Sequence, residues 1–186
     1  MTEENKVNYK DTLNLPKTNF PMKANLQQKE PEIQKIWKKE DVYKKLIDQN
    51  KTKEKFIFHD GPPYANGPIH LGHLLNKVLK DIVVRSKTME GYNVEFIPGW
   101  DCHGLPIEHK VLKELGDEAK ELTKIKIRNK CKSYADKYVK MQSKQMLRLG
   151  TLADYDNPYL SMTPDFEAGV LEVFKELVEK GLVCLL

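Results

Sequence analysis

Apolar residues recur at helical spacing in four parts of the chain. Between residues 33 and 47 they return every three or four positions, which predicts an amphipathic helix that begins near Pro31, with the proline in its first turn. A second apolar stripe runs from Leu71 to Val83 and predicts another helix. We expect two further helices, at about residues 123–149 and 165–180.

Two short runs of β-prone residues stand on either side of the second helix. Residues 56–58 read Phe-Ile-Phe and lead into a loop rich in glycine and proline, whereas residues 94–97 follow a turn at Gly91. Strand, loop, helix and strand in this order predict a βαβ unit with a parallel sheet and a right-handed crossover. The fold class is therefore α/β, and the loops at 60–70 and 98–108 should meet at one edge of the sheet.

Residues 1–30 lack this periodicity and contain Pro16 and Pro21, so we expect an extended arm there. A chain of 186 residues has room for one domain of ordinary size. We therefore divide it into an arm with one helix at 1–55 and an α/β domain at 56–186.

Composition excludes several classes of protein. Hydrophobic residues make up 40% and charged residues 31%, which is typical of a globular protein in water. The amino terminus has no apolar segment followed by a cleavage site, so we expect a cytoplasmic protein without a membrane partner. Three widely spaced cysteines predict reduced thiols rather than a disulfide framework or a structural zinc site, namely Cys102, Cys131 and Cys184.

Positive charge is concentrated between residues 123 and 150. This segment holds nine Lys or Arg and one acid, Asp136, so it carries +8 and the rest of the chain −4, within a net charge of +4. Such a block suits a polyanion such as RNA. A charge run on a helix is more often a solvated face, and both interpretations stay open.

His70 and His73 open the predicted second helix, three residues apart and therefore on one face. The amino end of a helix offers unpaired N–H groups and partial positive charge, where a phosphate chain binds readily. The two imidazoles can donate hydrogen bonds to phosphate oxygens, and Gly72 between them leaves room for a flat ring such as adenine. No Gly-x-x-x-x-Gly-Lys-Ser/Thr loop is present, which argues against a P-loop enzyme.

The same histidines could instead cap a helix for structural reasons, or bind zinc together with His59, Cys102 or His103. The sequence lacks a His-Glu-x-x-His motif and a close ligand pair, which argues against zinc. In the loop at 98–108, Asp101 is a candidate partner for an ammonium group, or a turn-forming residue. Nothing in the sequence lowers the pKa of Cys102, so we expect an inert thiol.

Two stretches of the chain resemble class I aminoacyl-tRNA synthetases. Residues 58–73 read Phe-His-Asp-Gly-Pro-Pro-Tyr-Ala-Asn-Gly-Pro-Ile-His-Leu-Gly-His, and the last four match the family's His-x-Gly-His signature. Residues 99–108 read Gly-Trp-Asp-Cys-His-Gly-Leu-Pro-Ile-Glu, which is similar to the isoleucyl members in particular. The resemblance extends from about residue 5 to residue 183.

This resemblance implies a Rossmann-like parallel-sheet catalytic domain, of which residues 56–186 would be the first half. It implies ATP-dependent activation of L-isoleucine to isoleucyl-adenylate with release of pyrophosphate, and then transfer to tRNA(Ile). Mg²⁺ would accompany the ATP, whereas zinc is not expected in this segment. We expect a monomer.

The resemblance also implies roles for individual residues. His70 and His73 would be catalytic and would stabilise the triphosphate as the α-phosphorus is attacked. Pro62 would touch the isoleucine side chain, and Asp101 would hold its ammonium group. The residues implied to bind the amino acid are Pro62, Trp100, Asp101 and His103. The residues implied to bind ATP, with Gly72 near adenine, are Gly61, Pro63, Tyr64, Asn66, Gly67, His70, Gly72 and His73.

The chain also departs from the family's pattern. The second signature, Lys-Met-Ser-Lys-Ser, would lie beyond residue 186, together with the editing and anticodon-binding domains. Residues 140–144 read Lys-Met-Gln-Ser-Lys and imitate that signature, but they lie in the predicted basic helix, so we interpret them as a decoy. Residues 184–186 differ from the family and indicate a truncation. We therefore expect a fragment that activates isoleucine poorly or not at all alone and is prone to self-association through exposed apolar surface.

Two alternatives to a synthetase fragment stay open. A stand-alone nucleotidylyltransferase would use the same helix-terminal histidines, but residues 100–108 are better explained by amino-acid recognition. A non-catalytic tRNA-binding module built on the basic segment would bind RNA in a salt-sensitive way that survives the loss of both histidines.

Overall fold

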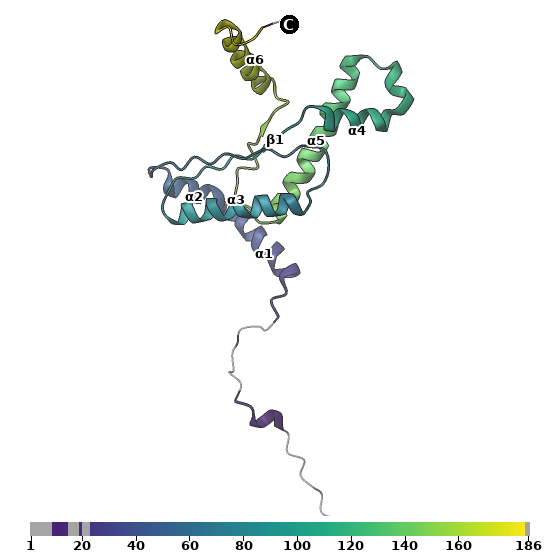
Figure 1. Ribbon diagram of the computed structural model, residues 1–186. Coiled ribbons are helices and arrows are strands. Elements are labelled where there is room, and N and C mark those ends of the chain that lie inside the picture. The colour runs from purple at the N-terminus through teal and green to yellow at the C-terminus, as the bar shows by residue number, and fades with distance from the viewer. Residues whose placement is uncertain (1–8, 15–18, 20–22, 185–186) are drawn as a thin grey trace, which may run out of the picture.

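A computed structural model describes residues 9–14, 19 and 23–184 (Figure 1). Helices dominate these residues and the strands are short. The elements in chain order are η1 (Tyr9–Thr12), α1 (Leu26–Lys39), α2 (Val42–Asn50), α3 (Leu71–Met89), β1 (Gly99–Trp100), α4 (Leu105–Leu115), η2 (Gly116–Glu121), α5 (Lys124–Arg148), β2 (Tyr159–Leu160) and α6 (Pro164–Glu179). The predicted arm falls partly outside the described residues, at 1–8, 15–18 and 20–22.

The predicted first helix is two helices in the structure. α1 begins at Leu26, so Pro31 lies inside the helix and not in its first turn, which corrects the prediction. The fixed φ of proline fits a helix even where its missing N–H removes a hydrogen bond. The chain then turns at Asp41, whose φ of 49° is left-handed and cannot continue a right-handed helix, and α2 follows.

The two segments predicted as strands beside α3 are extended but are not strands. Residues 56–58 and 94–97 have no strand assignment, which corrects the sequence analysis. An isolated parallel bridge joins Lys55 to Asn93 at the start of both segments. In Figure 1 the two segments run alongside each other and α3 connects them, which is the path of a βαβ unit. Prolines at the far ends of both segments, such as Pro98, have no N–H to donate to a ladder.

The parallel sheet forms further along the same segments. β1 pairs in parallel with β2, with Gly99 opposite Tyr159, and a second isolated parallel bridge joins Tyr64 to Asp101. β1 therefore lies between the segment that precedes α3 and the strand that precedes α6. Gly99 permits close packing here, because a Cβ at this position would lie only 1.9 Å from the Tyr159 ring.

α4 begins inside the stretch that the sequence predicted as a loop. Residues 98–108 instead contain β1, a short bend and the first turn of α4 from Leu105 onward. Pro106 is compatible with a first turn because its missing N–H would be unpaired there anyway. Ile107 and Val111, four residues apart, bury one face of this helix.

α5 confirms the predicted basic helix. Its buried face carries Ala135, Val139 and Met146, which belong with Trp100 and Ile107 to the main hydrophobic core, and the buried polar Gln142. Most of its lysines and arginines are exposed. Residues 140–144 lie inside this helix, as expected if they only resemble the second synthetase signature.

Several helices expose apolar side chains, and α3 and α6 are the examples that matter for the expected apolar surface. On α3, Leu71 is 81% exposed and Leu75 is 64% exposed, although both belong to the predicted apolar stripe. α6 buries none of its residues and projects away from the other elements (Figure 1). The apolar surface expected from the sequence is therefore present on both helices. Within the described part of the chain, no helix is long and apolar enough to cross a bilayer.

Candidate active site

His70 and His73 lie together at the amino end of α3, as predicted. His70 is the N-cap residue, and its Nδ1 accepts a hydrogen bond from the backbone N–H of Gly72 at 3.1 Å. The Nδ1 of His73 accepts one from the backbone N–H of His70 at 3.3 Å, and the ring centroids are 4.1 Å apart. The two side chains form a reciprocal capping box, a role more often filled by Ser or Thr with Glu or Gln.

This cap fixes where the histidines can donate. A ring nitrogen that accepts a hydrogen bond carries no proton, so the proton of each neutral imidazole sits on Nε2. His70 is exposed and His73 is partly exposed. The helix start therefore presents two Nε2–H donors next to its own partial positive charge, an arrangement suited to phosphate oxygens.

Gly72 is required by the cap itself. A Cβ at this position would lie 2.9 Å from Cε1 of His70, closer than non-bonded carbon atoms approach. A larger residue would push the imidazole away from the N–H that it caps. The glycine thus has a structural role next to the predicted contact with adenine.

The electrostatic surroundings of His73 favour its neutral form. Burial lowers the pKa of His73, and the nearby His70 and Lys77 lower it further. A neutral imidazole can donate a hydrogen bond without carrying a charge. The positive charge near His73 therefore comes from two lysines of α3, Lys77 and Lys80.

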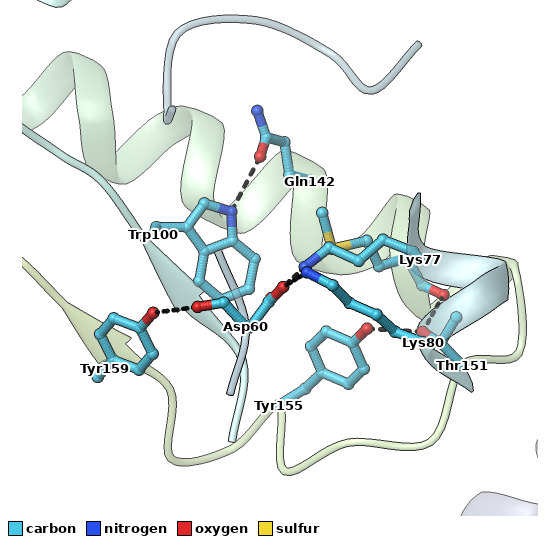
Figure 2. A network of polar contacts seen from close by, with 9 residues as sticks. Asp60, Lys77, Lys80, Trp100, Gln142, Thr151, Tyr155 and Tyr159 are labelled. Atoms are coloured by element: carbon cyan, nitrogen blue, oxygen red, sulfur yellow. Dashed lines mark hydrogen bonds and ion pairs between the residues drawn. The ribbon is translucent and has the colours of Figure 1, made fainter. Parts of the chain in front are cut away.

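These lysines belong to a buried cluster under the amino-terminal half of α3. Lys77 and Lys80 both form ion pairs with Asp60, whose side chain has no exposed surface (Figure 2). Burial lowers the pKa of Lys77, and the hydrogen bond to Asp60 opposes that shift. When both lysines are protonated, two positive charges face one negative charge, so the cluster has a surplus positive charge. Asp60 also anchors the start of the glycine-rich loop, because its carbonyl accepts from the Tyr159 hydroxyl at 3.3 Å.

The glycine-rich loop at 61–67 is fixed to the end of β1 by backbone hydrogen bonds. The N–H of Asp101 donates to the carbonyl of Pro63, and the N–H of Ala65 donates to the carbonyl of Asp101, both at 2.9 Å. Ala65 is completely buried. The two signature stretches therefore meet, as the sequence predicted from the geometry of parallel sheets.

Side chains of α4 and α5 hold the loop from its other side. Gln142 donates to the carbonyls of Tyr64 and Gly67, at 3.0 and 2.7 Å. Lys110 donates to the carbonyl of Asn66 at 2.7 Å. These contacts use the backbone of the loop, so the Tyr64 side chain remains 45% exposed, and Gly61 and Pro62 are exposed as well.

Asp101 keeps its carboxylate available. Its Oδ1 accepts from the backbone N–H of His103 at 3.3 Å and from the Ser161 hydroxyl at 3.4 Å, and neither donor is a cation. The side chain is partly exposed. This is the environment of a carboxylate that can still pair with an ammonium group.

Trp100 and His103 are engaged by other parts of the protein. The indole of Trp100 has no exposed surface and donates to Oε1 of Gln142 at 2.9 Å. Nε2 of His103 lies 3.1 Å from the carbonyl of Ser161 and 3.1 Å from Oε1 of Glu167, in the first turn of α6. Contact of either ring with an amino acid stays a prediction.

Cys102 and the other cysteines are free thiols. Burial raises the pKa of Cys102 to about 11, and the negative charge of Asp101 adds to the shift. A thiol with such a pKa carries almost no thiolate near neutral pH, so the expectation of an inert residue agrees with its surroundings.

Neither His70 nor His73 lines any of the following three cavities. One of about 420 Å³ includes Phe58, Asp60 and Tyr159 in its lining. Another of about 540 Å³ lies between α4, α5 and α6, and a third of about 670 Å³ lies between α1, α2 and the end of α5. His70 is exposed and His73 is partly exposed outside these three cavities.

Sequence reasoning missed three contributors to this geometry. Gln142 and Asp60 are two of the residues that hold the loop, and Tyr159 links Asp60 to β2. The sequence carried little signal for this cluster, because Lys77 and Lys80 stand among other polar residues of an amphipathic helix.

Comparison with known proteins places the chain in a family. A family model described as tRNA synthetases class I (I, L, M and V) matches residues 32–185, which is most of the chain. The chain belongs to this family. Its α/β class and its partial Rossmann-like unit are those expected from the resemblance.

Isoleucine–tRNA ligases are among the most similar relatives of this class I synthetase chain. The protein from Kosmotoga olearia is 56% identical over 177 residues, and the one from Thermotoga neapolitana is 54% identical over 177 residues. Each match covers 95% of the chain and 19% of the relative. The chain thus spans about a fifth of the length of these relatives.

A solved structure shares the fold. The ternary complex of Agrobacterium radiobacter LeuRS with tRNA and LeuAMS matches 86% of this chain and 18% of that chain, with a TM-score of 0.65 and 23% sequence identity. The class I synthetase fold is therefore present here, although the paired strands of this chain are only two residues long.

Proposed function

We propose that this chain carries the nucleotide-binding and amino-acid-binding part of an isoleucine–tRNA ligase. The single observation that supports the proposal most is the pairing of the glycine-rich loop with the end of β1. Through the bridge between Tyr64 and Asp101, the loop that leads to His70 and the carboxylate of Asp101 share one edge of the sheet. The high identity to relatives with this name supports isoleucine as the amino acid.

In this proposal ATP binds as its magnesium complex at the amino end of α3. The Nε2–H groups of His70 and His73 donate to phosphate oxygens, and the helix terminus adds partial positive charge. Gly61, Pro63, Asn66 and Gly67 shape the loop beside the nucleotide, and Gly72 allows the base to approach. The cluster of Asp60, Lys77 and Lys80 has a surplus positive charge, which attracts the negatively charged triphosphate.

The amino acid binds beside the nucleotide in the same proposal. Asp101 pairs with the ammonium group, Pro62 contacts the side chain, and Trp100 and His103 complete the surroundings. The carboxylate oxygen of isoleucine then attacks the α-phosphorus, a P–O bond forms to give isoleucyl-adenylate, and pyrophosphate leaves. The protein contributes positioning and stabilisation of charge rather than a covalent intermediate.

The remaining parts of the proposal concern the longer protein that the relatives represent. Transfer of the isoleucyl group to tRNA(Ile) would take place there, with the exposed cations of α5 available to the phosphate backbone. We propose a cytoplasmic protein that is monomeric when the apolar faces of α3 and α6 are covered.

Binding of MgATP to the 186-residue chain, measured by isothermal titration, tests the nucleotide site. We expect binding that is lost in the His70→Ala, His73→Ala double variant and kept in Cys131→Ser, a control in α5 outside the site. Equal affinity in the double variant and the wild type would contradict the proposal.

A further inference from the structure

Gln142 makes a complete set of hydrogen bonds inside the core. Its side chain is 1% exposed. Oε1 accepts from the indole N–H of Trp100 at 2.9 Å, and Nε2 donates to the carbonyls of Tyr64 at 3.0 Å and Gly67 at 2.7 Å (Figure 2 shows the contact with Trp100). One acceptor and both donors of the amide are therefore in use.

The partners fix the orientation of this amide. An indole N–H can only donate and a backbone carbonyl can only accept, so a flipped amide would lose all three hydrogen bonds. Replacing the amide with an apolar group would leave the Trp100 indole without its acceptor and the two carbonyls without this donor. A glutamine is thus matched to this position by hydrogen-bonding pattern as well as by size.

The three partners belong to the two halves of the candidate site. Tyr64 and Gly67 lie in the loop that leads to His70, whereas Trp100 lies in β1 directly before Asp101. The direct link between the halves consists of the two backbone hydrogen bonds around Asp101. Gln142 is a third support, and it reaches both halves from α5.

We propose that Gln142 is a positioning residue that couples the nucleotide half of the site to the amino-acid half. It fixes the position of the glycine-rich loop relative to β1. Binding of ATP or isoleucine therefore orders the backbone that contacts the other ligand. This inference rests on the proposed function. Gln142 lies within residues 140–144, so this stretch would have a structural role that is unrelated to the Lys-Met-Ser-Lys-Ser signature.

Gln145 provides a matched control one turn further along α5. Its Oε1 accepts from the backbone N–H of Ile69 at 3.0 Å. That contact reaches only the segment that leads to His70. A variant at Gln145 should therefore loosen the nucleotide half alone, whereas a variant at Gln142 should loosen both halves.

Backbone hydrogen exchange and the indole N–H resonance of Trp100 test the structural part on the 186-residue chain. In Gln142→Met we expect the amides of Ala65 and Asp101 to exchange about tenfold faster or more, and the indole resonance to move, because three hydrogen bonds are lost together. In Gln145→Met we expect faster exchange at Ile69 only. Unchanged exchange at Ala65 and Asp101 in Gln142→Met would overturn the proposal.

Ligand coupling tests the functional part, in a way that general destabilisation would not reproduce. The affinity for MgATP is measured with and without L-isoleucine. We expect isoleucine to strengthen ATP binding in the wild type and in Gln145→Met, and to have no effect in Gln142→Met. The same coupling in Gln142→Met as in the wild type would count against the proposal.

If Gln142→Met does not fold, Gln142→Glu is the alternative variant for the hydrogen-exchange test. Its carboxylate can still accept from Trp100 but cannot donate to the two carbonyls, so the indole resonance should stay while exchange at Ala65 rises. A variant that loses the indole contact and leaves Ala65 protected would overturn the assignment. If the wild-type chain binds neither ligand, the proposed function fails, and hydrogen exchange alone decides the role of Gln142.

Discussion

The amino end of α3 depends on a few side chains that serve its structure and its proposed chemistry together. His70 uses Nδ1 to cap the helix, and in the proposed function its Nε2 donates to a phosphate oxygen. Gly72 has to be small because the capping imidazole occupies the space where its Cβ would lie. A change at either position should therefore alter the free energy of unfolding as well as binding.

Gly72→Ala tests how the glycine depends on the cap. Alanine in place of glycine within a helix normally stabilises by about 1 kcal/mol. Here it displaces the His70 ring and loses a cap worth about 1 kcal/mol, so we expect no net gain in the wild type. In a His70→Ala background the clash is gone, and the substitution should stabilise by about 1 kcal/mol. Urea unfolding of the four proteins measures this, and equal effects in both backgrounds would refute the dependence.

The lowered pKa of His73 predicts a pH dependence of stability. In the unfolded chain the imidazole takes up a proton near its ordinary pKa of 6.5, whereas the folded protein does so only at lower pH. The free energy of unfolding should therefore fall as pH drops from 6.5 towards the native pKa of His73. His73→Gln removes the titration and retains an acceptor for the capping box. Urea unfolding at a series of pH values should give a smaller decrease for this variant, and an identical decrease would exclude His73 as its source.

At the scale of elements, the site depends on how the extended segment before the glycine-rich loop is fixed to α3. Lys77 and Lys80 reach from the helix to the carboxylate of Asp60 at the end of that segment. Few backbone hydrogen bonds hold the segment, because most of it lies outside any ladder. A buried charge cluster thus replaces sheet pairing at the point where the loop begins.

Asp60→Asn should be strongly destabilising. The variant leaves the buried Lys77 and the partly buried Lys80 without their counter-charge, and breaking a buried ion pair in this way costs about 3–5 kcal/mol. Asp136→Asn is the matched control, because its ion pair with Lys140 lies on the surface of α5 and should contribute less than about 1 kcal/mol. Chemical denaturation of both variants provides the comparison, and a similar small loss in each would show that the cluster contributes little.

The helices were predictable because their apolar spacing is long and regular. α5 and α6 begin and end close to the expected residues, whereas α3 begins at the expected Leu71 but continues to Met89, past the predicted stripe that ended at Val83. The strands were not, because a run such as 56–58 shows β propensity but not whether a neighbour offers hydrogen bonds. α4 was missed because Gly104 and Pro106 suggest a loop, although proline also fits a first turn.

In the candidate site, the placement of the histidines and the meeting of the two loops followed from spacing and topology. The role of Gln142 did not, since two of its three hydrogen bonds go to backbone carbonyls of residues more than 70 positions earlier.

For the whole molecule, we expect the exposed apolar faces of α3 and α6 to govern behaviour in solution. We expect the 186-residue chain to self-associate and to bind a hydrophobic dye, because side chains such as Leu75 and Phe174 are more than half exposed. Leu75→Lys together with Phe174→Lys should reduce the average mass in sedimentation experiments without lowering the melting temperature. A monodisperse wild-type chain with a high melting temperature would contradict this expectation.

We propose that this chain supplies the isoleucine-activating site of a class I synthetase. The most direct test replaces the matching segment of the Kosmotoga olearia isoleucine–tRNA ligase with this chain and measures amino-acid-dependent ATP–pyrophosphate exchange. We predict exchange that prefers isoleucine to leucine, weakens in Asp101→Asn and disappears in the His70→Ala, His73→Ala double variant. A hybrid that folds but shows no exchange, or exchange that persists without both histidines, would contradict the account.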